Sequence, residues 1–421
     1  MRVNRFRPLA AKLAVYSAIV LGTLVLLDLG MIALGLFPPS YDYGDLDAGW
    51  VAARPTGQME QAACTEYSTG DPAIYQRNED AARTSVGAQR LREEPELFTI
   101  AVGGDSQTDL CAPNGQTHFG VLERELSARG QETVTFAYGA GKYSALQAYF
   151  AVRRLIDAYS ADAFVLNFYT GNDFYDMMRV DDRPHFVRRG ERYEIAPPVW
   201  YQQDPPGIKR YSRTLYAIRT IGKRTGIRNV VLRLRYLRAI AVEQGKGLPT
   251  VLAYMNDLRR SATPEVGYSA AFAAQMLNQQ LFFHRVPGSR EETVRRVRAL
   301  LELIRREHPD LLLVVSALPS YQLVQQQPVD PAFLGVFERL PLTFEGGVRE
   351  EGELYETLRR LAAETGWVFA DNLTPLRQYA GDERLYNDFD YHLLPVASEI
   401  IGRAQAQAIR SYLDSRPIPS R

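Results

Sequence analysis

The chain has 421 residues, 46% of them hydrophobic and 23% charged, which is an ordinary composition for a globular protein. Lys and Arg together number 49, and so do Asp and Glu, so the formal net charge is zero. This balance excludes recruitment of nucleic acid by a global positive field, and any electrostatic function must be local. The length exceeds that of a usual single domain and is enough to bury a large core.

The N-terminal region contains a long apolar segment, residues 13–37, with Asp28 as its single charged residue. As a helix it would extend about 37 Å at about 1.5 Å per residue, longer than a hydrocarbon core of roughly 30 Å, so one tilted span fits. Four basic residues precede it: Arg2, Arg5, Arg7 and Lys12. The positive-inside rule places them in the cytoplasm and the chain after the segment on the extracytoplasmic side. Residues 1–40 are therefore predicted to form a cytoplasmic tip and a single-pass membrane anchor.

Two points about this anchor stay open. A cleaved signal peptide is the rival interpretation, although its apolar region is usually shorter and no clean small-x-small site occurs before Pro38. Asp28 is costly in lipid, which indicates either a partner helix from a membrane protein or a position near the hydrated outer face.

The chain has two cysteines, Cys64 and Cys111, too few for a disulfide framework or a cysteine-based zinc site. If most of the chain lies outside the cytosol, one Cys64–Cys111 disulfide can form. Two separate buried thiols are the alternative interpretation.

From residue 97 onward, short apolar runs alternate with helical spacing. The predicted strands are 97–102, 134–137, 163–168, 311–315 and 367–369, and the predicted helices are 117–128, 145–159, 291–307, 354–364 and 395–412. Because each strand is continuously apolar, we expect a central parallel sheet covered by helices on both faces, a three-layer α/β/α sandwich. Ligands of such sheets bind beyond the carboxyl ends of the strands.

Two regions lack this alternation of predicted strands and helices. Residues 41–96 are predicted to form a stalk or a segment that wraps the folded core. Residues 181–289 are predicted to be a mostly helical, basic insertion or lid, which divides the core domain into 97–180 and 290–415. Within it, 209–238 has many Lys and Arg and no acidic residue. A solvated basic face, contact with anionic lipid and contact with an anionic polymer substrate are the three interpretations.

Ser106 is the first candidate for a catalytic residue, because Gly104-Asp105-Ser106 follows a predicted strand and precedes a predicted helix. A serine at such a turn exposes its hydroxyl at the sheet edge, and its backbone N–H can face a developing oxyanion. Acyl transfer also requires further oxyanion donors and a general base.

Four blocks in order resemble those of the SGNH (GDSL-type) hydrolase superfamily: 102–108, 137–147, 168–173 and 387–395. The resemblance covers most of the chain from residue 97 and implies a flavodoxin-like sandwich. It also implies Ser106 as nucleophile, Gly139 and Asn172 as oxyanion donors beside the Ser106 N–H, and His392 as base. Two positions depart from the pattern. Ala137 stands where the family usually has Asn, and Phe389 where its triad Asp often lies, so Asp390 becomes the candidate carboxylate with Asp388 in reserve.

The residues themselves favour the same base. Of five histidines, His392 lies in a loop before a helix with carboxylates nearby, whereas His118 opens a helix close to Ser106 and is an awkward base. His308 lies at a helix end, and His185 and His284 lie in the insertion. Gly139 as a simple turn glycine and Asn172 as a helix cap remain alternatives, and Asp173 is expected to cap or brace its loop.

The expected function is that of an exported, membrane-anchored serine esterase acting on acyl esters, such as O-acetyl groups of cell-surface carbohydrate. A polysaccharide O-acyltransferase with the same acyl-enzyme is the alternative, and a non-catalytic envelope scaffold is the second. Nothing in the sequence indicates a metal, an organic cofactor or a nucleic-acid partner.

Overall fold

In the computed structural model the described residues are 57–65, 72–179 (without 129, 131 and 142), 183–197 (without 191), 286–325, 344–386 and 392–415. Two short strands, β1 (Tyr43–Asp45) and β2 (Gly49–Val51), and scattered single residues between 16 and 30 and at 279 and 283 are also described.

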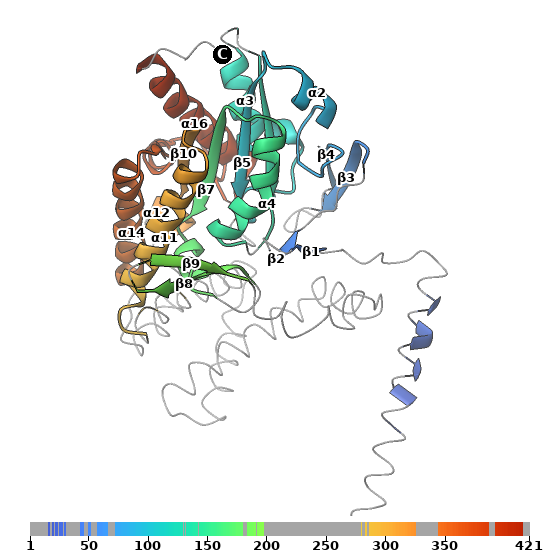
Figure 1. Cartoon of the computed structure of the whole chain (residues 1–421), viewed down its shortest axis with the longest axis horizontal. Helices are drawn as coiled ribbons and strands as arrows, with labels where there is room; N and C mark the ends of the chain where they lie inside the picture. The colour runs from blue at the N-terminus through green and yellow to red at the C-terminus, as the bar shows by residue number, and fades with distance from the viewer. Residues whose placement is uncertain are drawn as a thin grey trace, which may run out of the picture.

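The core is a five-stranded sheet in the order β11-β10-β7-β5-β6 (Figure 1). Every neighbouring pair in it is parallel, which confirms the predicted sheet. Its strands are β5 (Phe98–Gly104), β6 (Thr133–Gly139), β7 (Ala163–Tyr169), β10 (Leu312–Leu318) and β11 (Val368–Asp371). Counted along the chain, this is the flavodoxin-like order 2-1-3-4-5, which reverses between β5 and β7.

Helices cover both faces of this sheet. One face packs on α3 (His118–Ser127) and α16 (Pro395–Ser415), and the other on α4 (Ala145–Ala158), α11 (Ser289–Glu307) and α14 (Phe344–Glu364). Alternate residues of one strand enter different cores, since Val165 packs with Phe119 of α3 whereas Phe164 packs with Tyr149 of α4. Full burial on both faces explains why the strands read as continuous apolar runs.

Most predicted elements agree with the structure within a few residues, but α14 begins ten residues before the predicted 354. Its first turns contain Gly346 and Gly347, which weaken helix propensity and conceal the start of the helix in the sequence. Shorter helices are α2 (Ala88–Glu93), α5 (Asp173–Asp176), α12 (Tyr321–Gln325), α15 (Leu373–Gln378) and the 3₁₀ turn η1 (Asn114–Gln116).

The segment before β5 contains a hairpin that no sequence pattern predicts. Strand β3 (Glu60–Thr65) pairs antiparallel with β4 (Pro72–Arg77). Beyond β4 the chain lies on the core, with Ala82 and Leu91 buried. Cys64 and Cys111 form a disulfide with a Cα–Cα distance of 5.7 Å, which decides between the two interpretations of these cysteines.

Two predicted regions fall largely outside the described residues. Of the insertion 181–289, the beginning forms a hairpin of β8 (His185–Arg189) and β9 (Arg192–Ala196), while 198–278, including the basic segment 209–238, lies outside. The predicted anchor, 13–37, is described only at scattered positions. Across the described residues, no helix combines the length and apolar character needed to span a membrane.

Candidate active site

Ser106 lies in a tight turn directly beyond β5, at the point where the strand order reverses. The Asp105 carbonyl accepts hydrogen bonds from the N–H groups of Thr108 and Asp109, both at 3.1 Å. The Asp105 Oδ1 accepts another from the Gln107 N–H at 2.9 Å. The residues around Ser106 are buried, whereas Ser106 itself is half-buried. The turn thus presents the serine at the carboxyl edge of the sheet, where doubly wound folds bind ligands.

Glycines at two strand ends allow this turn to pack closely. A Cβ added to Gly104 would lie 2.1 Å from the Thr108 Oγ1, and one added to Gly139 would lie 2.9 Å from the Asp105 carbonyl oxygen. Real Cβ atoms do not approach other atoms so closely, so both positions require glycine for steric reasons.

The predicted oxyanion glycine, Gly139, therefore lies against the main chain of the turn, next to Asp105 and Asp109. Gly141 is nearer to the nucleophile's side chain: a Cβ added there would lie 3.8 Å from the Ser106 Cβ and meet no other atom within 4 Å. The sequence block 137–147 contains this second glycine, and the Gly-Ala-Gly spacing could have indicated it.

Asn172 follows β7 and precedes α5. Its Nδ2 donates to the Asp176 Oδ2 at 3.1 Å, while its buried Oδ1 has no hydrogen-bond partner among the described residues. Asn172 occupies the N-cap position of α5, as its helix-cap alternative expects, but its side chain makes no capping hydrogen bond within the described part of the chain. A primary amide carries two N–H donors, and the bond to Asp176 uses one of them.

Asp173 has the bracing role expected of it. Its Oδ2 accepts the Tyr169 N–H at 2.8 Å, which joins α5 to the end of β7. Burial raises the pKa of this carboxyl well above its usual range, and the neighbouring Asp105 and Asp176 add to the effect.

Asp176, a residue that no sequence pattern singles out, is held by a buried ion pair. Its Oδ1 lies 2.9 Å from Nη1 of Arg183, with the two side chains 5% and 1% exposed. Burial raises the pKa of Asp176 to about 6, although Arg183 and Arg179 oppose the shift. The pair fixes the carboxylate that in turn holds the Asn172 amide.

His392 reaches this turn from the far end of the chain. The N–H of the next residue, Leu393, donates to the Gln107 Oε1 at 3.1 Å, across a sequence separation of 286. Tyr386 and Leu393 form an isolated antiparallel bridge that steadies the loop from the other side. Burial raises the pKa of Asp105 to about 6, and the charge of nearby His392 acts in the opposite direction. The main chain next to His392 thus contacts the turn that contains Ser106.

Asp390, the predicted orienting carboxylate, and Asp388, its reserve, lie in 387–391, outside the described residues. Of the carboxylates in the described part of the chain, Asp105 is buried and acts electrostatically on His392.

The other described histidines have structural surroundings. His118 is fully buried, its Nε2 lies 2.8 Å from the Asn167 Nδ2, and burial, aided by Arg83, lowers its pKa to about 3. It is thus a neutral acceptor and a poor base. His308 contacts the Tyr149 hydroxyl at 3.0 Å, and the His185 Nδ1 lies 3.3 Å from the Arg183 carbonyl. His284 lies outside the described residues.

A buried polar network joins the nucleophile turn to α16. The Asn167 Nδ2 donates to the Thr108 Oγ1 at 2.9 Å, and the Gln405 Nε2 donates to the Asn167 Oδ1 at 2.9 Å and the Ser316 Oγ at 2.8 Å. These hydrogen bonds connect α16, the helix that follows His392, to the turn, although the buried Gln405 Oε1 has no partner among the described residues.

In the described ranges, no group of three or more His, Cys, Asp or Glu side chains could hold a metal ion.

Comparison with known proteins gives distant structural similarity only. No protein-family model and no curated protein sequence matches the chain. A lipase/acylhydrolase from Enterococcus faecalis is 12% identical over 75% of this chain and 96% of its own, with a TM-score of 0.35. Axe2, an acetylxylan esterase from Geobacillus stearothermophilus, is 12% identical over 76% and 95%, also with a TM-score of 0.35. LAE5, an alpha/beta hydrolase enzyme from the metagenome of Lake Arreo, is 13% identical over 74% and 94%, with a TM-score of 0.33. At these values the chemistry has to be argued from this chain's own residues.

Proposed function

We propose that this chain is a serine hydrolase of ester bonds with Ser106 as its nucleophile. One observation carries the proposal: the turn that presents Ser106 at the strand-order reversal is hydrogen-bonded, through Gln107 and Leu393, to the segment that carries His392. A serine hydroxyl and an imidazole brought together at a ligand-binding edge are the minimum for nucleophilic acyl transfer.

In the proposed reaction His392 accepts the Ser106 proton as Oγ attacks the ester carbonyl. The tetrahedral oxyanion is stabilised by the Ser106 N–H, the second N–H of the Asn172 amide and a backbone N–H of the 139–141 segment. Gly141 suits this last role better than the predicted Gly139, because it lies beside the Ser106 side chain. Collapse expels the alcohol, protonated by His392, and leaves an acyl-enzyme that water hydrolyses.

The imidazolium formed in each step needs a nearby negative charge. We propose Asp390 for this role, with Asp388 in reserve, on their position before His392. Asp105 adds a second, buried charge on the side of the nucleophile turn. A negative charge beside the ring stabilises the protonated base.

The substrate and the location are further parts of the proposal. We propose acyl esters of carbohydrate, such as O-acetyl groups, as substrates and residues 1–40 as a membrane anchor, with the domain on the extracytoplasmic side. The Cys64–Cys111 disulfide supports export, because disulfides persist in oxidising compartments. Transfer of the acyl group to a sugar hydroxyl would use the same acyl-enzyme.

The test is covalent labelling of the full-length chain in detergent with a fluorophosphonate, together with hydrolysis of p-nitrophenyl acetate. We expect the label on Ser106, and we expect Ser106→Ala and His392→Ala each to lower hydrolysis by about 10³-fold or more. Ser85→Ala, at an exposed serine, is the matched control and should behave like the unmodified chain. Labelling or hydrolysis that persists in Ser106→Ala would contradict the proposal. Acylated sugar formed at the expense of free acid, when oligosaccharide is added, would indicate transfer.

A further inference from the structure

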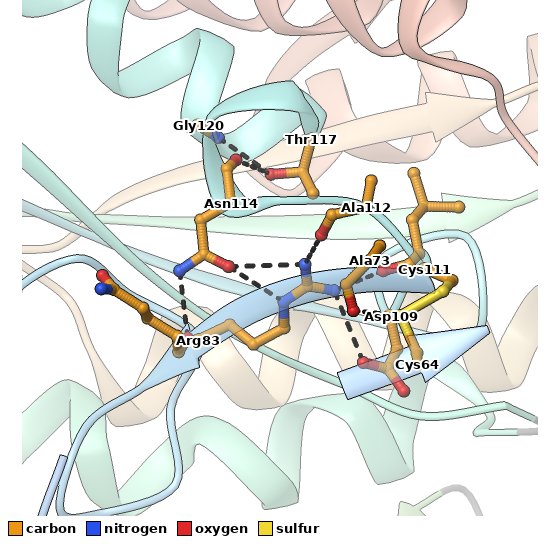
Figure 2. Close-up of polar contacts among 11 residues, drawn as sticks. Cys64, Ala73, Arg83, Asp109, Cys111, Ala112, Asn114, Thr117 and Gly120 are labelled. Atoms are coloured by element: carbon orange, nitrogen blue, oxygen red, sulfur yellow. Dashed lines mark hydrogen bonds and ion pairs between the residues drawn. A yellow bond between two sulfur atoms is a disulfide. The ribbon is translucent and has the colours of Figure 1, made fainter. Parts of the chain in front are cut away.

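Arg83 lies in the segment before the core and is directed at the loop that follows the nucleophile turn. It is 3% exposed, and its Nη1 and Nη2 donate to the carbonyls of Leu110 at 2.6 Å and Ala112 at 2.7 Å (Figure 2). Its Nε and Nη2 also contact the Asn114 Oδ1, both at 3.4 Å. One planar guanidinium therefore binds three residues of a loop that begins four residues after Ser106.

Asp109 connects this arrangement to the turn itself. Its carboxylate forms an ion pair with the Arg83 Nη1 at 3.6 Å, and its N–H donates to the Asp105 carbonyl at 3.1 Å. Displacement of the guanidinium would thus act on the hydrogen bonds that shape the turn around Ser106.

The backbone of Arg83 is fixed on the other side. Its N–H donates to the Ala137 carbonyl at 2.8 Å, and its own carbonyl accepts the Ala137 N–H at 2.9 Å. Ala137 lies in β6, two residues before Gly139. Arg83 accordingly connects the loop after the Ser106 turn to β6, whose end flanks the proposed oxyanion site.

The disulfide adds a second tether to the same loop. Cys111 stands between Leu110 and Ala112, whose carbonyls Arg83 holds, and its bond to Cys64 joins the loop to β3 (Figure 2). The neighbouring strand β4 contributes Tyr75, whose ring lies 4.3 Å from the guanidinium carbon. The hairpin is therefore joined to the loop by a disulfide bond and to the Arg83 guanidinium by a cation–π contact.

We propose that Arg83 is a positioning residue for the nucleophile, and that together with the Cys64–Cys111 disulfide it clamps the 109–114 loop and so holds Ser106 in its reactive position. The inference rests on the proposed function of Ser106. It makes the segment before β5 part of the working enzyme and not only its connection to the N-terminus.

The test compares Arg83→Lys with Arg305→Lys in the full-length chain. Lysine keeps the charge but cannot bind three acceptors in one plane. Arg305 is a matched control, because it also donates to main-chain carbonyls, of Leu311 and Gly366, but at the amino edge of the sheet. We expect Arg83→Lys to slow fluorophosphonate labelling and kcat about tenfold, while KM and the final labelled fraction stay near their original values. Arg305→Lys should leave the rate unchanged.

An unchanged rate in Arg83→Lys would overturn the proposal. So would a lower labelled fraction at an unchanged rate, since that pattern reports only a loss of folded molecules.

Hydrogen exchange separates this proposal from the function on which it rests. Amide exchange in peptides covering 105–112 should be faster in Arg83→Lys and unaltered in Arg305→Lys, whether or not Ser106 reacts. If exchange is faster in Arg83→Lys but the unmodified chain never labels, the hydrolase is contradicted and the clamp still stands. Unaltered exchange would overturn the clamp.

Combining variants tests whether the two tethers act together. Replacing both cysteines by serine should slow labelling as well, and adding Arg83→Lys should slow it by less than the product of the separate effects, because both act on one loop. Effects that multiply in full would show that Arg83 and the disulfide act independently, which would overturn the joint clamp.

Discussion

The two ends of the central sheet carry charge in different ways. At the carboxyl end the ionisable groups are buried: Asp105, Asp173 and Asp176 surround the proposed site, and burial raises the pKa of each. Glu351 is also buried there, accepting from the Thr170 Oγ1 at 2.6 Å and the Ser320 N–H at 3.0 Å.

At the amino end the charges form half-exposed ion pairs, such as Arg298 with Glu364 and Arg90 with Glu132. Buried carboxyls with raised pKa values oppose folding at neutral pH, whereas exposed pairs contribute little in either direction. A fold retains unfavourable groups where they do chemistry, so the contrast itself points to the carboxyl end as the active site.

The largest effect is expected when the proposed oxyanion amide, Asn172, is removed. Asn172→Ala should lower kcat for p-nitrophenyl acetate about 10²-fold, because one oxyanion donor contributes about that much to stabilising the transition state. Asp176→Asn should lower kcat less, since Asn172 itself remains, and it should also destabilise the fold, because it leaves the buried Arg183 without its partner charge. Steady-state kinetics at pH 8 measures both. A kcat for Asn172→Ala within a factor of two of the original would exclude Asn172 from the oxyanion site.

Stability should respond to Asp105 in a pH-dependent way. Burial raises its pKa from 3.8 to about 6, so between about pH 4 and pH 6 the folded state binds more protons and loses stability as the pH rises. Asp105→Asn removes this loss and should be more stable than the original chain by about 3 kcal/mol at pH 7.5, with little difference at pH 4. The same variant should hydrolyse esters more slowly. Urea unfolding at both pH values measures the difference, and a gap that does not grow with pH contradicts the assignment.

The smallest effect is expected at the amino end. Arg298→Ala breaks the ion pair with Glu364 and should change the free energy of unfolding by less than about 0.5 kcal/mol, because both side chains are about two-fifths exposed. Hydrolysis and its pH dependence should not change. A loss as large as that of Asn172→Ala would remove the distinction between the two ends.

Sequence patterns predict the sheet because its strands are buried on both faces and leave an unmistakable apolar signal, as at 163–168. They also place Ser106, Asn172 and His392, which stand at strand or helix boundaries. Asp176, Arg183 and Arg83 cannot be found in this way, because each lies in a stretch without periodicity and its contacts are set by the fold. The hairpin of β3 and β4 is missed for a related reason: the disulfide that joins it to the 109–114 loop links residues 47 positions apart and leaves no local pattern.

The position of α16 has a consequence for the synthesis and folding of this protein. The proposed nucleophile, Ser106, belongs to the first third of the chain, and the proposed base, His392, precedes α16, whose Ala406 and Ile409 are buried against the sheet and α3. A ribosome must therefore release nearly the whole described domain before the base can meet the serine. A nascent chain would carry Ser106 in an unactivated form, and reactivity toward esters would arise only with the docking of the last helix.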